Sequence, residues 1–224
     1  MIPIPDAIVA GLCVGLYHPE LRPVAWDHLD PGNDPDHVCW GLRRIGDIDV
    51  VVLRGSIALI DWRRDLDSWA NPFRHDALGP VHAGFLAGMD DTWREMRPLL
   101  REPGRTIVAG HSLGAGRACI LTGMMVRDGV APMARVCFGE PRPGFQHLAD
   151  LIAGVPARSY RNGDGWHHDL ITDVPYFVPP LSYVHPARLT AVDARPAPEL
   201  SGKLGIFAYH HMPLYEVALL KAAV

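Results

Sequence analysis

The stretch Thr106-Ile107-Val108-Ala109-Gly110-His111-Ser112-Leu113-Gly114 joins a short apolar run to the pattern Gly-x-Ser-x-Gly. The apolar run predicts a strand, and residues 114–126 are expected to form a helix. A serine on a sharp turn from a strand into a helix exposes its hydroxyl beside helix N–H groups that stabilise negative charge. The stretch therefore predicts that Ser112 is a nucleophile. The competing interpretation is that Ser112 only caps the helix that follows it.

The rest of the sequence alternates between short β-branched runs and segments with helical spacing. Strands are expected at residues 49–53, 106–109, 135–138 and 158–161, and helices at residues 90–100, 114–126 and 214–223. Strands that alternate with helices are typical of an α/β fold with a parallel sheet. Residues 162–203 show nothing long and periodic, and no linker divides the chain. We therefore expect residues 1–224 to form a single domain with a mostly parallel central sheet flanked by helices.

The composition is that of an ordinary globular protein. Of the 224 residues, 48% are apolar and 21% are charged, which excludes extensive disorder. The formal net charge is −4, from 21 basic and 25 acidic residues, without a long run of one sign. Because this balance gives no electrostatic footprint for nucleic acid or for an anionic membrane surface, neither is expected as a partner.

The cysteines and the N-terminal residues bear on the compartment. Cys13, Cys39, Cys119 and Cys137 are scattered without C-x-x-C spacing, so neither a structural zinc site nor a redox motif is expected. Cys119 and Cys137 lie within apolar runs and are expected to be small buried thiols. The apolar stretch at residues 7–16 has no basic residue ahead of it and is too short to span a bilayer. These features predict a cytoplasmic protein, with release by a non-standard export route as the alternative.

A nucleophilic serine needs a base, and the base needs a carboxylate that orients it. When the serine lies on a strand-to-helix turn of this kind, the chain order is serine, acid, histidine. His210 and His211 stand just ahead of the last predicted helix, where a base from the final loop is expected. Asp164, Asp169 and Asp173 in the preceding loop are the acid candidates.

Five blocks share their order and spacing with one known family. They are Leu53-Arg54-Gly55-Ser56, Asp61-Trp62-Arg63-Arg64-Asp65-Leu66, Val81-His82-Ala83-Gly84-Phe85, Gly110-His111-Ser112-Leu113-Gly114-Ala115 and Gly139-Glu140-Pro141-Arg142-Pro143-Gly144. Together they resemble the class 3 lipases, a branch of the α/β-hydrolases that includes fungal triacylglycerol lipases. The resemblance covers about residues 50–216. It implies the α/β-hydrolase fold and a serine carboxylic ester hydrolase that acts through an acyl-enzyme.

The resemblance also selects among the acid and base candidates. The family's acid stands in the frame D-x-[VI]-x-x-[VL]-P, and Asp169 occupies that position, with Asp164 as the runner-up and Asp173 as a solvated loop charge. Bacterial members often read H-x-[MI]-x-x-Y around the base, which places His210 first and leaves His211 as the alternative register. The implied catalytic residues are therefore Ser112, Asp169 and His210.

An oxyanion hole is expected beside the nucleophile. One donor is the backbone N–H of Leu113, the residue after the serine. The resemblance implies that Ser56 supplies the second donor, through its N–H and its hydroxyl; the alternative is that Ser56 is an ordinary helix N-cap.

Residues 57–78 lie where the family carries its lid. The segment interleaves apolar and charged residues, so it is a candidate amphipathic cover that meets a lipid–water interface. The alternative is a surface helix whose apolar side packs on the core. The implied substrate is a lipid ester or a small-molecule ester.

No cofactor and no metal are expected. The run His167-His168-Asp169 resembles a metal cluster, but adjacent residues on an extended chain point to opposite faces, which disfavours a shared ion. His82 and His111 are expected to be packing residues rather than bases.

The chain departs from the family in three respects. Glu140 stands in the G-x-P-R turn where a small residue is commoner, the chain is short, and it has no evident disulfide pattern. The resemblance is therefore to a short, bacterial-type member. Two other functions stay open: the same triad acting on feruloyl or acetyl-sugar esters, and a catalytically silent binding protein on this fold.

Overall fold

The computed structural model of the chain describes residues 3–32, 37–55, 72–175 and 181–222. Within these ranges one sheet has the strand order β1-β2-β3-β6-β7-β8-β10, and β9 pairs with β8 outside this path. Its strands are His28–Asp30 (β1), Trp40–Ile45 (β2), Ile48–Leu53 (β3), Thr106–His111 (β6), Ala134–Phe138 (β7), Ala157–Asp164 (β8), His167–His168 (β9) and Leu189–Val192 (β10). The pairs from β3 to β10 are parallel, whereas β1, β2 and β3 pair antiparallel. The prediction of an α/β fold with a mostly parallel sheet is confirmed.

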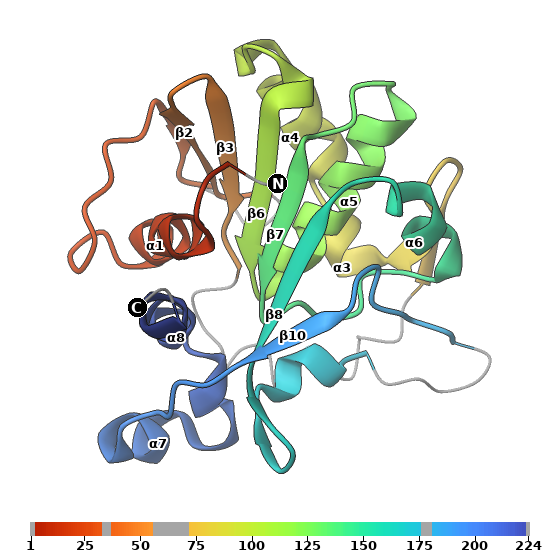
Figure 1. Cartoon of the computed structure of the whole chain (residues 1–224). Helices are drawn as coiled ribbons and strands as arrows, with labels where there is room; N and C mark the ends of the chain where they lie inside the picture. Colours follow the sequence, from red (N-terminus) through yellow and green to blue (C-terminus); the bar gives the residue numbers. More distant parts are fainter. Residues whose placement is uncertain (1–2, 33–36, 56–71, 176–180, 223–224) are drawn as a thin grey trace.

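Helices cover both faces of this sheet (Figure 1). On one face, α1 (Asp6–Tyr17) and α8 (Met212–Ala222) pack against each other and against the central strands. On the other face lie α3 (Ala83–Leu86), α4 (Met89–Met96), α5 (Leu113–Arg127) and α6 (Gln146–Ile152). Every residue of β3, β6 and β7 is buried as a result, which explains why these strands read as continuous apolar runs.

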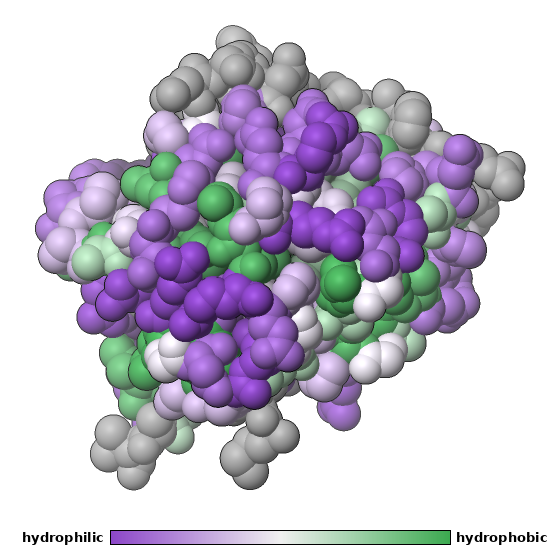
Figure 2. Space-filling model, turned by 90° about the horizontal axis from the view of Figure 1, so that it is seen from above, coloured by the Kyte–Doolittle hydropathy of each residue, from purple (hydrophilic) through white to green (hydrophobic). Residues whose placement is uncertain are grey.

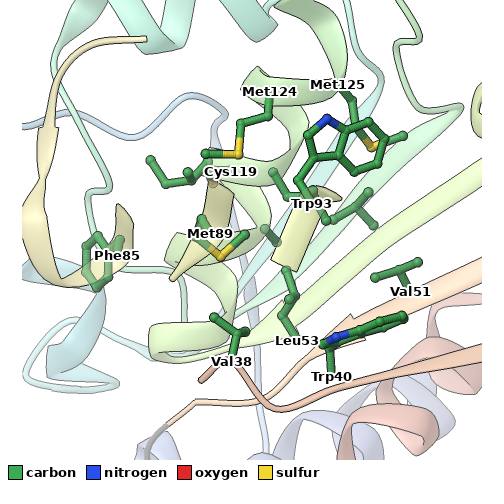
Figure 3. Close-up of a cluster of buried hydrophobic side chains, with 14 of the residues drawn as sticks. Val38, Trp40, Val51, Leu53, Phe85, Met89, Trp93, Cys119, Met124 and Met125 are labelled. Atoms are coloured by element: carbon green, nitrogen blue, oxygen red, sulfur yellow. The ribbon is translucent and has the colours of Figure 1, made fainter. Parts of the chain in front are cut away.

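The core on the α3–α5 side holds large apolar side chains (Figure 3). Trp40 and Leu53 from the sheet belong to one buried cluster with Met89, Trp93 and Met124 from the helices. The indole N–H of Trp93 donates a hydrogen bond to Asp128 at 2.8 Å, just past the end of α5. Close packing of this kind holds α5 in a fixed position on the sheet.

The two ends of the sheet differ in character. The carboxyl ends of β6, β7 and β8 lie at the lower end of the molecule in Figure 1. The opposite end, seen in Figure 2, is largely hydrophilic; there buried Asp49 accepts hydrogen bonds from the backbone N–H and the Nε–H of Arg101, each at 2.8 Å. In open α/β sheets ligands bind beyond the carboxyl ends of the strands.

Two regions add to or differ from the expectations drawn from the sequence, which assigned no secondary structure to the first of them. The apolar stretch at residues 7–16 forms most of α1, and its residues from Val9 to Leu16 are buried. The region expected to be loops contains β10, which pairs parallel with β8, and α7 (Pro198–Leu204). The four residues of β10 are half-buried or exposed, so no apolar run marks the strand. No helix in the described part of the chain has the length and apolar character that crossing a membrane requires.

The candidate lid at residues 57–78 is only partly described. Residues 57–71, and Ser56 before them, lie outside the described residues. The rest begins with β4 (Pro72–His75), which pairs antiparallel with β5 (Gly79–His82). In its described part the segment is therefore a β-hairpin strand and turn rather than a helix.

Candidate active site

Ser112 lies on the turn between β6 and α5, with a strained backbone. Its φ is 62° and its ψ is −130°, and among the described residues it is the one non-glycine residue with positive φ. Such a conformation costs of order 1–3 kcal/mol and persists only when the surroundings enforce it. Here the Ser112 N–H donates to the carbonyl of Phe138 on β7 at 3.1 Å. Within the described chain its side chain caps no N–H of α5, which disfavours the helix-cap interpretation.

The two glycines of the turn leave no room for side chains. A Cβ on Gly110 would lie 2.2 Å from the carbonyl oxygen of Gly114, and one on Gly114 would lie 2.0 Å from that of Leu53. The start of α5 can therefore approach β3 and β6 only with glycine at both positions. This contact holds Ser112 at the carboxyl end of the sheet.

Asp169 and His210 form a buried pair at the same end. Nδ1–H of His210 donates to Oδ2 of Asp169 at 2.6 Å, and both residues are 0% exposed. Oδ1 of Asp169 accepts from the N–H of Ile171 at 2.9 Å, and Oδ2 also accepts from the hydroxyl of Tyr215. A carboxylate bonded to Nδ1–H fixes the tautomer of a neutral imidazole, so Nε2 is left as a base.

Tyr215 on α8 contacts Asp169, and this contact was not predicted from the sequence. Burial, together with the charge of Asp169, raises the pKa of the phenol well above its usual value, so it stays protonated and can donate to the carboxylate. Its oxygen also accepts from the backbone N–H of Asn162 at 3.1 Å. The tyrosine therefore ties Asp169 to the end of β8. The one signal was the tyrosine in the H-x-[MI]-x-x-Y pattern.

Gly139, which follows β7, lies directly against the pair. Its φ is 55°, and a Cβ there would lie 2.6 Å from Oδ2 of Asp169 and 2.8 Å from Nδ1 of His210. Only glycine fits, because the backbone conformation and the space both exclude a side chain. The end of β7 is thus part of the wall that holds the acid and the histidine together.

His111 packs on the other side of His210. The two rings are stacked with centroids 4.4 Å apart, and Nε2–H of His111 donates to the main-chain carbonyl of His210 at 2.8 Å. Burial, reinforced by the nearby charge of His210, lowers the pKa of His111 well below its usual value. His111 is therefore neutral; its Nδ1 and its main-chain carbonyl oxygen each lie 3.2 Å from the hydroxyl oxygen of Tyr17, which donates to the carbonyl. The Tyr17 oxygen in turn accepts from the N–H of Gly55 at 2.7 Å.

A pocket of about 240 Å³ brings the two reactive groups together, since both Ser112 and His210 line it. Nε2 of His210 is buried and has no hydrogen-bond partner among the described residues. Leu113 is the first residue of α5, so its N–H is one of those that a helix cannot bond internally. The pocket thus joins a strained serine, an imidazole nitrogen without a partner and a helix N-terminus.

The family of the chain follows from its sequence profile. The profile described as Lipase (class 3) matches residues 50–178. The chain belongs to the class 3 lipase family. It is therefore a carboxylic ester hydrolase, and the α/β-hydrolase fold is the one that its solved relatives share. No curated protein sequence matches this class 3 lipase.

Solved fungal lipases have a similar fold. The lipase from Rhizopus microsporus var. chinensis has a TM-score of 0.68 and 18% identity, over 86% of this chain and 75% of the other. The Rhizomucor miehei lipase propeptide complex has a TM-score of 0.64 and 18% identity, over 84% and 67%. Lipase II from Rhizopus niveus has a TM-score of 0.62 and 20% identity, over 75% and 72%. At these identities the comparison establishes the fold.

The alternative acid and base candidates of this class 3 lipase lie elsewhere. Asp164 is exposed at the end of β8, and Asp173 accepts a hydrogen bond from Nε2–H of His168 at 2.7 Å. His211 lines the same pocket as Ser112, but its ring lies edge-on to His18, with ring centroids 5.8 Å apart. Burial, followed by nearby histidine charges, lowers its pKa. The structure thus brings Asp169 together with His210.

The run His167-His168-Asp169 does not converge on one point. The ring of His167 is stacked near Tyr209, with centroids 6.4 Å apart, and His168 bonds to Asp173. Asp169 bonds to His210. The three side chains therefore have three separate sets of partners. His82, also expected to be a packing residue, is buried, and its Nδ1 accepts from the N–H of Gly84 at 3.1 Å.

Glu140, the unusual residue of the turn after β7, is fully buried in a polar cluster. Its Oε2 accepts from the hydroxyl of Ser159 at 2.7 Å and lies 3.5 Å from Nη1 of Arg135. Burial alone raises the pKa of the carboxyl, but the charge of Arg135, the nearby ring of His185 (Nδ1 3.6 Å from Oε1) and the hydrogen bond from Ser159 outweigh it and lower the pKa to about 2. The turn that carries Gly139 is therefore fixed by a buried ion pair.

Proposed function

We propose that Ser112, Asp169 and His210 are the catalytic triad of this class 3 lipase. Oγ of Ser112 attacks the ester carbonyl while Nε2 of His210 takes its proton. The tetrahedral intermediate then collapses, and the protonated His210 gives that proton to the departing alcohol. Water, deprotonated by His210, hydrolyses the acyl-enzyme and releases the acid. Asp169 keeps the imidazole oriented and stabilises its charged form throughout.

The observation that carries this proposal is the asymmetry of His210. One ring nitrogen is bonded to Asp169 at 2.6 Å, and the other has no partner among the described residues and lines the pocket of Ser112. A packing histidine in a buried site normally satisfies both nitrogens. A base needs one nitrogen available for the proton of the nucleophile.

The oxyanion hole is proposed to contain the N–H of Leu113 and a donor from Ser56. Leu113 starts α5, where the helix dipole also favours negative charge. The assignment of Ser56 rests on its place in the Leu53-Arg54-Gly55-Ser56 block. Losing one such donor typically reduces transition-state stabilisation by about 3–4 kcal/mol.

The substrate is proposed to be a lipid ester, since the family is named for lipases. Residues 57–78 are proposed as its lid. If this is right, hydrolysis of a short soluble ester rises sharply when the ester exceeds its solubility and forms droplets. A smooth saturation curve through the solubility limit contradicts the lid. A panel of p-nitrophenyl esters beside feruloyl and acetylated sugar esters separates a lipid esterase from a polysaccharide esterase.

The decisive test is labelling of the folded protein with a fluorophosphonate, followed by peptide mapping. We expect one adduct, on Ser112, and none on that peptide in Ser112→Ala. A chain without an adduct on Ser112 would be a silent binding protein. Denatured protein serves as the control, because reaction then no longer depends on the assembled site.

A further inference from the structure

Helix α7 (Pro198–Leu204) lies over the pocket of Ser112 rather than on the sheet. It contains no buried residue, and it runs directly into the 3-10 turn Gly205–His210 that carries the proposed base. Figure 1 shows it at the lower left, away from the central sheet. A helix in this position contributes little to the main core, so its placement calls for another explanation.

The two faces of α7 have different surroundings. Leu200, Lys203 and Leu204 line the same pocket as Ser112 and His210, and both leucines are half-buried. Residues four apart lie on one face of a helix, so the two leucines form a continuous apolar patch toward the pocket. On the rest of the helix, Glu199 and Gly202 are exposed. Helix α7 therefore turns its two leucines toward the pocket and its exposed residues toward the solvent.

The pocket joins reactive polar groups to an apolar wall. Ser112 and His210 line it together with the leucines of α7 and Met212, which supply apolar lining. An ester whose carbonyl carbon lies at Ser112 needs an apolar space for its acyl chain, because burying that chain is what favours binding. At about 240 Å³ the pocket is smaller than the roughly 300–1,000 Å³ of typical small-molecule sites.

We infer that α7 is the acyl-binding wall of the enzyme and that Leu200 and Leu204 limit the length of the acyl chain. This inference rests on the proposed triad, and it assigns a short-chain acyl group as the preferred substrate class. A chain of butyrate length packs against the leucines, whereas a long chain such as laurate collides with them. Gly205 follows α7 with a φ of 56°. This backbone conformation sets the angle between α7 and the 3-10 turn that carries His210.

The test is the ratio of kcat/KM for p-nitrophenyl laurate to that for p-nitrophenyl butyrate. Leu200→Ala and Leu204→Ala enlarge the pocket, so we expect the ratio to rise by about tenfold or more. Tenfold is the low end of the change in kcat/KM that one methylene group causes in an apolar pocket. Leu204→Trp fills the pocket and is expected to lower the ratio by a similar factor while p-nitrophenyl acetate is still hydrolysed. Alanine is a better helix former than leucine, so the enlarging variants keep the intrinsic helical propensity of α7.

Glu199→Ala is the matched control, because it changes the outward face of the same helix. We expect its ratio to equal that of the wild-type chain. The inference about α7 is contradicted if neither alanine variant raises the ratio and Leu204→Trp does not lower it. If Ser112 is still labelled in that case, the proposed triad is unaffected. If the wild-type chain hydrolyses no ester and Ser112 is not labelled, the triad fails and the inference fails with it.

Discussion

His111 donates its Nε2–H to the main-chain carbonyl of His210 at 2.8 Å, while the two rings lie stacked 4.4 Å apart. The residue before the proposed nucleophile thus holds the backbone of the proposed base. This contact joins the end of β6 to the turn ahead of α8, two segments far apart in sequence. The position of Nε2 of His210 relative to Ser112 depends on it.

Replacing His111 with phenylalanine tests this positioning role. His111→Phe keeps a stacked ring but leaves the His210 carbonyl without its donor, while the Tyr17 hydroxyl still donates to the main-chain carbonyl of residue 111. A lost buried hydrogen bond is worth about 1–2 kcal/mol, so we expect kcat to fall by roughly tenfold or more with a small change in KM. The measurement is steady-state hydrolysis of p-nitrophenyl butyrate. His147→Phe, at an exposed position on α6, should leave kcat unchanged.

The low pKa of His111 makes the folded state sensitive to acid. The folded protein keeps this imidazole neutral, whereas the unfolded chain binds a proton at about pH 6.5. Stability from this group is therefore present above about pH 6.5 and is lost as the pH falls below it, by up to about 1.4 kcal/mol per pH unit. Urea unfolding at several pH values should show a shallower loss for His111→Phe than for the wild-type chain. Equal slopes in the two proteins would contradict a neutral His111.

Tyr215→Phe removes the hydroxyl that donates to Asp169 and accepts from the Asn162 N–H. We expect the free energy of unfolding to fall by about 1–3 kcal/mol, because the buried N–H loses its partner. The rate kcat should fall as well, since the carboxylate is held less firmly. Tyr160→Phe is the control: its hydroxyl bonds to Asp6, away from the pocket, so it should lower stability and leave kcat unchanged. Chemical denaturation and steady-state rates together distinguish the two.

Gly139→Ala and Gly165→Ala separate backbone strain from crowding at the site. Both glycines have positive φ, 55° and 52°, so both variants incur about 1–2 kcal/mol of strain. Only Gly139 has the Asp169 and His210 side chains within 3 Å of the added Cβ; nothing lies within 4 Å at Gly165. We expect Gly139→Ala to lose nearly all hydrolysis and Gly165→Ala to retain it. Similar activity in the two variants would mean that the close packing of Gly139 against Asp169 and His210 is not needed for hydrolysis.

The sequence predicted the parts of the fold that local patterns encode. The turn at Ser112 was readable because its glycines and its apolar strand stand side by side in the chain. The central strands were readable because burial on both faces makes most of their residues apolar. In contrast, β10 is too short and exposed to carry such a pattern. For the stretch that forms α1, only a leader and a membrane span were considered; both were rejected, and no helix was predicted.

The site was predictable only in part for a related reason. Asp169 and His210 came from chain order and family resemblance, and the structure places them together. The contacts of Gly139, His111 and Tyr215 with that pair join segments that are distant in sequence, so no local pattern reveals them. The role of α7 is of the same kind, because it depends on which way the helix faces. Ser56 and residues 57–71 remain predictions.

The identity of the base is the most direct test of the triad. The measurement is kcat/KM for p-nitrophenyl butyrate in His210→Ala and, separately, in His211→Ala. Because His210, rather than His211, is the histidine that bonds to Asp169, we predict a loss of about 10⁴-fold or more in His210→Ala and less than about tenfold in His211→Ala. The opposite result, with His210→Ala retaining activity and His211→Ala losing it, would contradict the account.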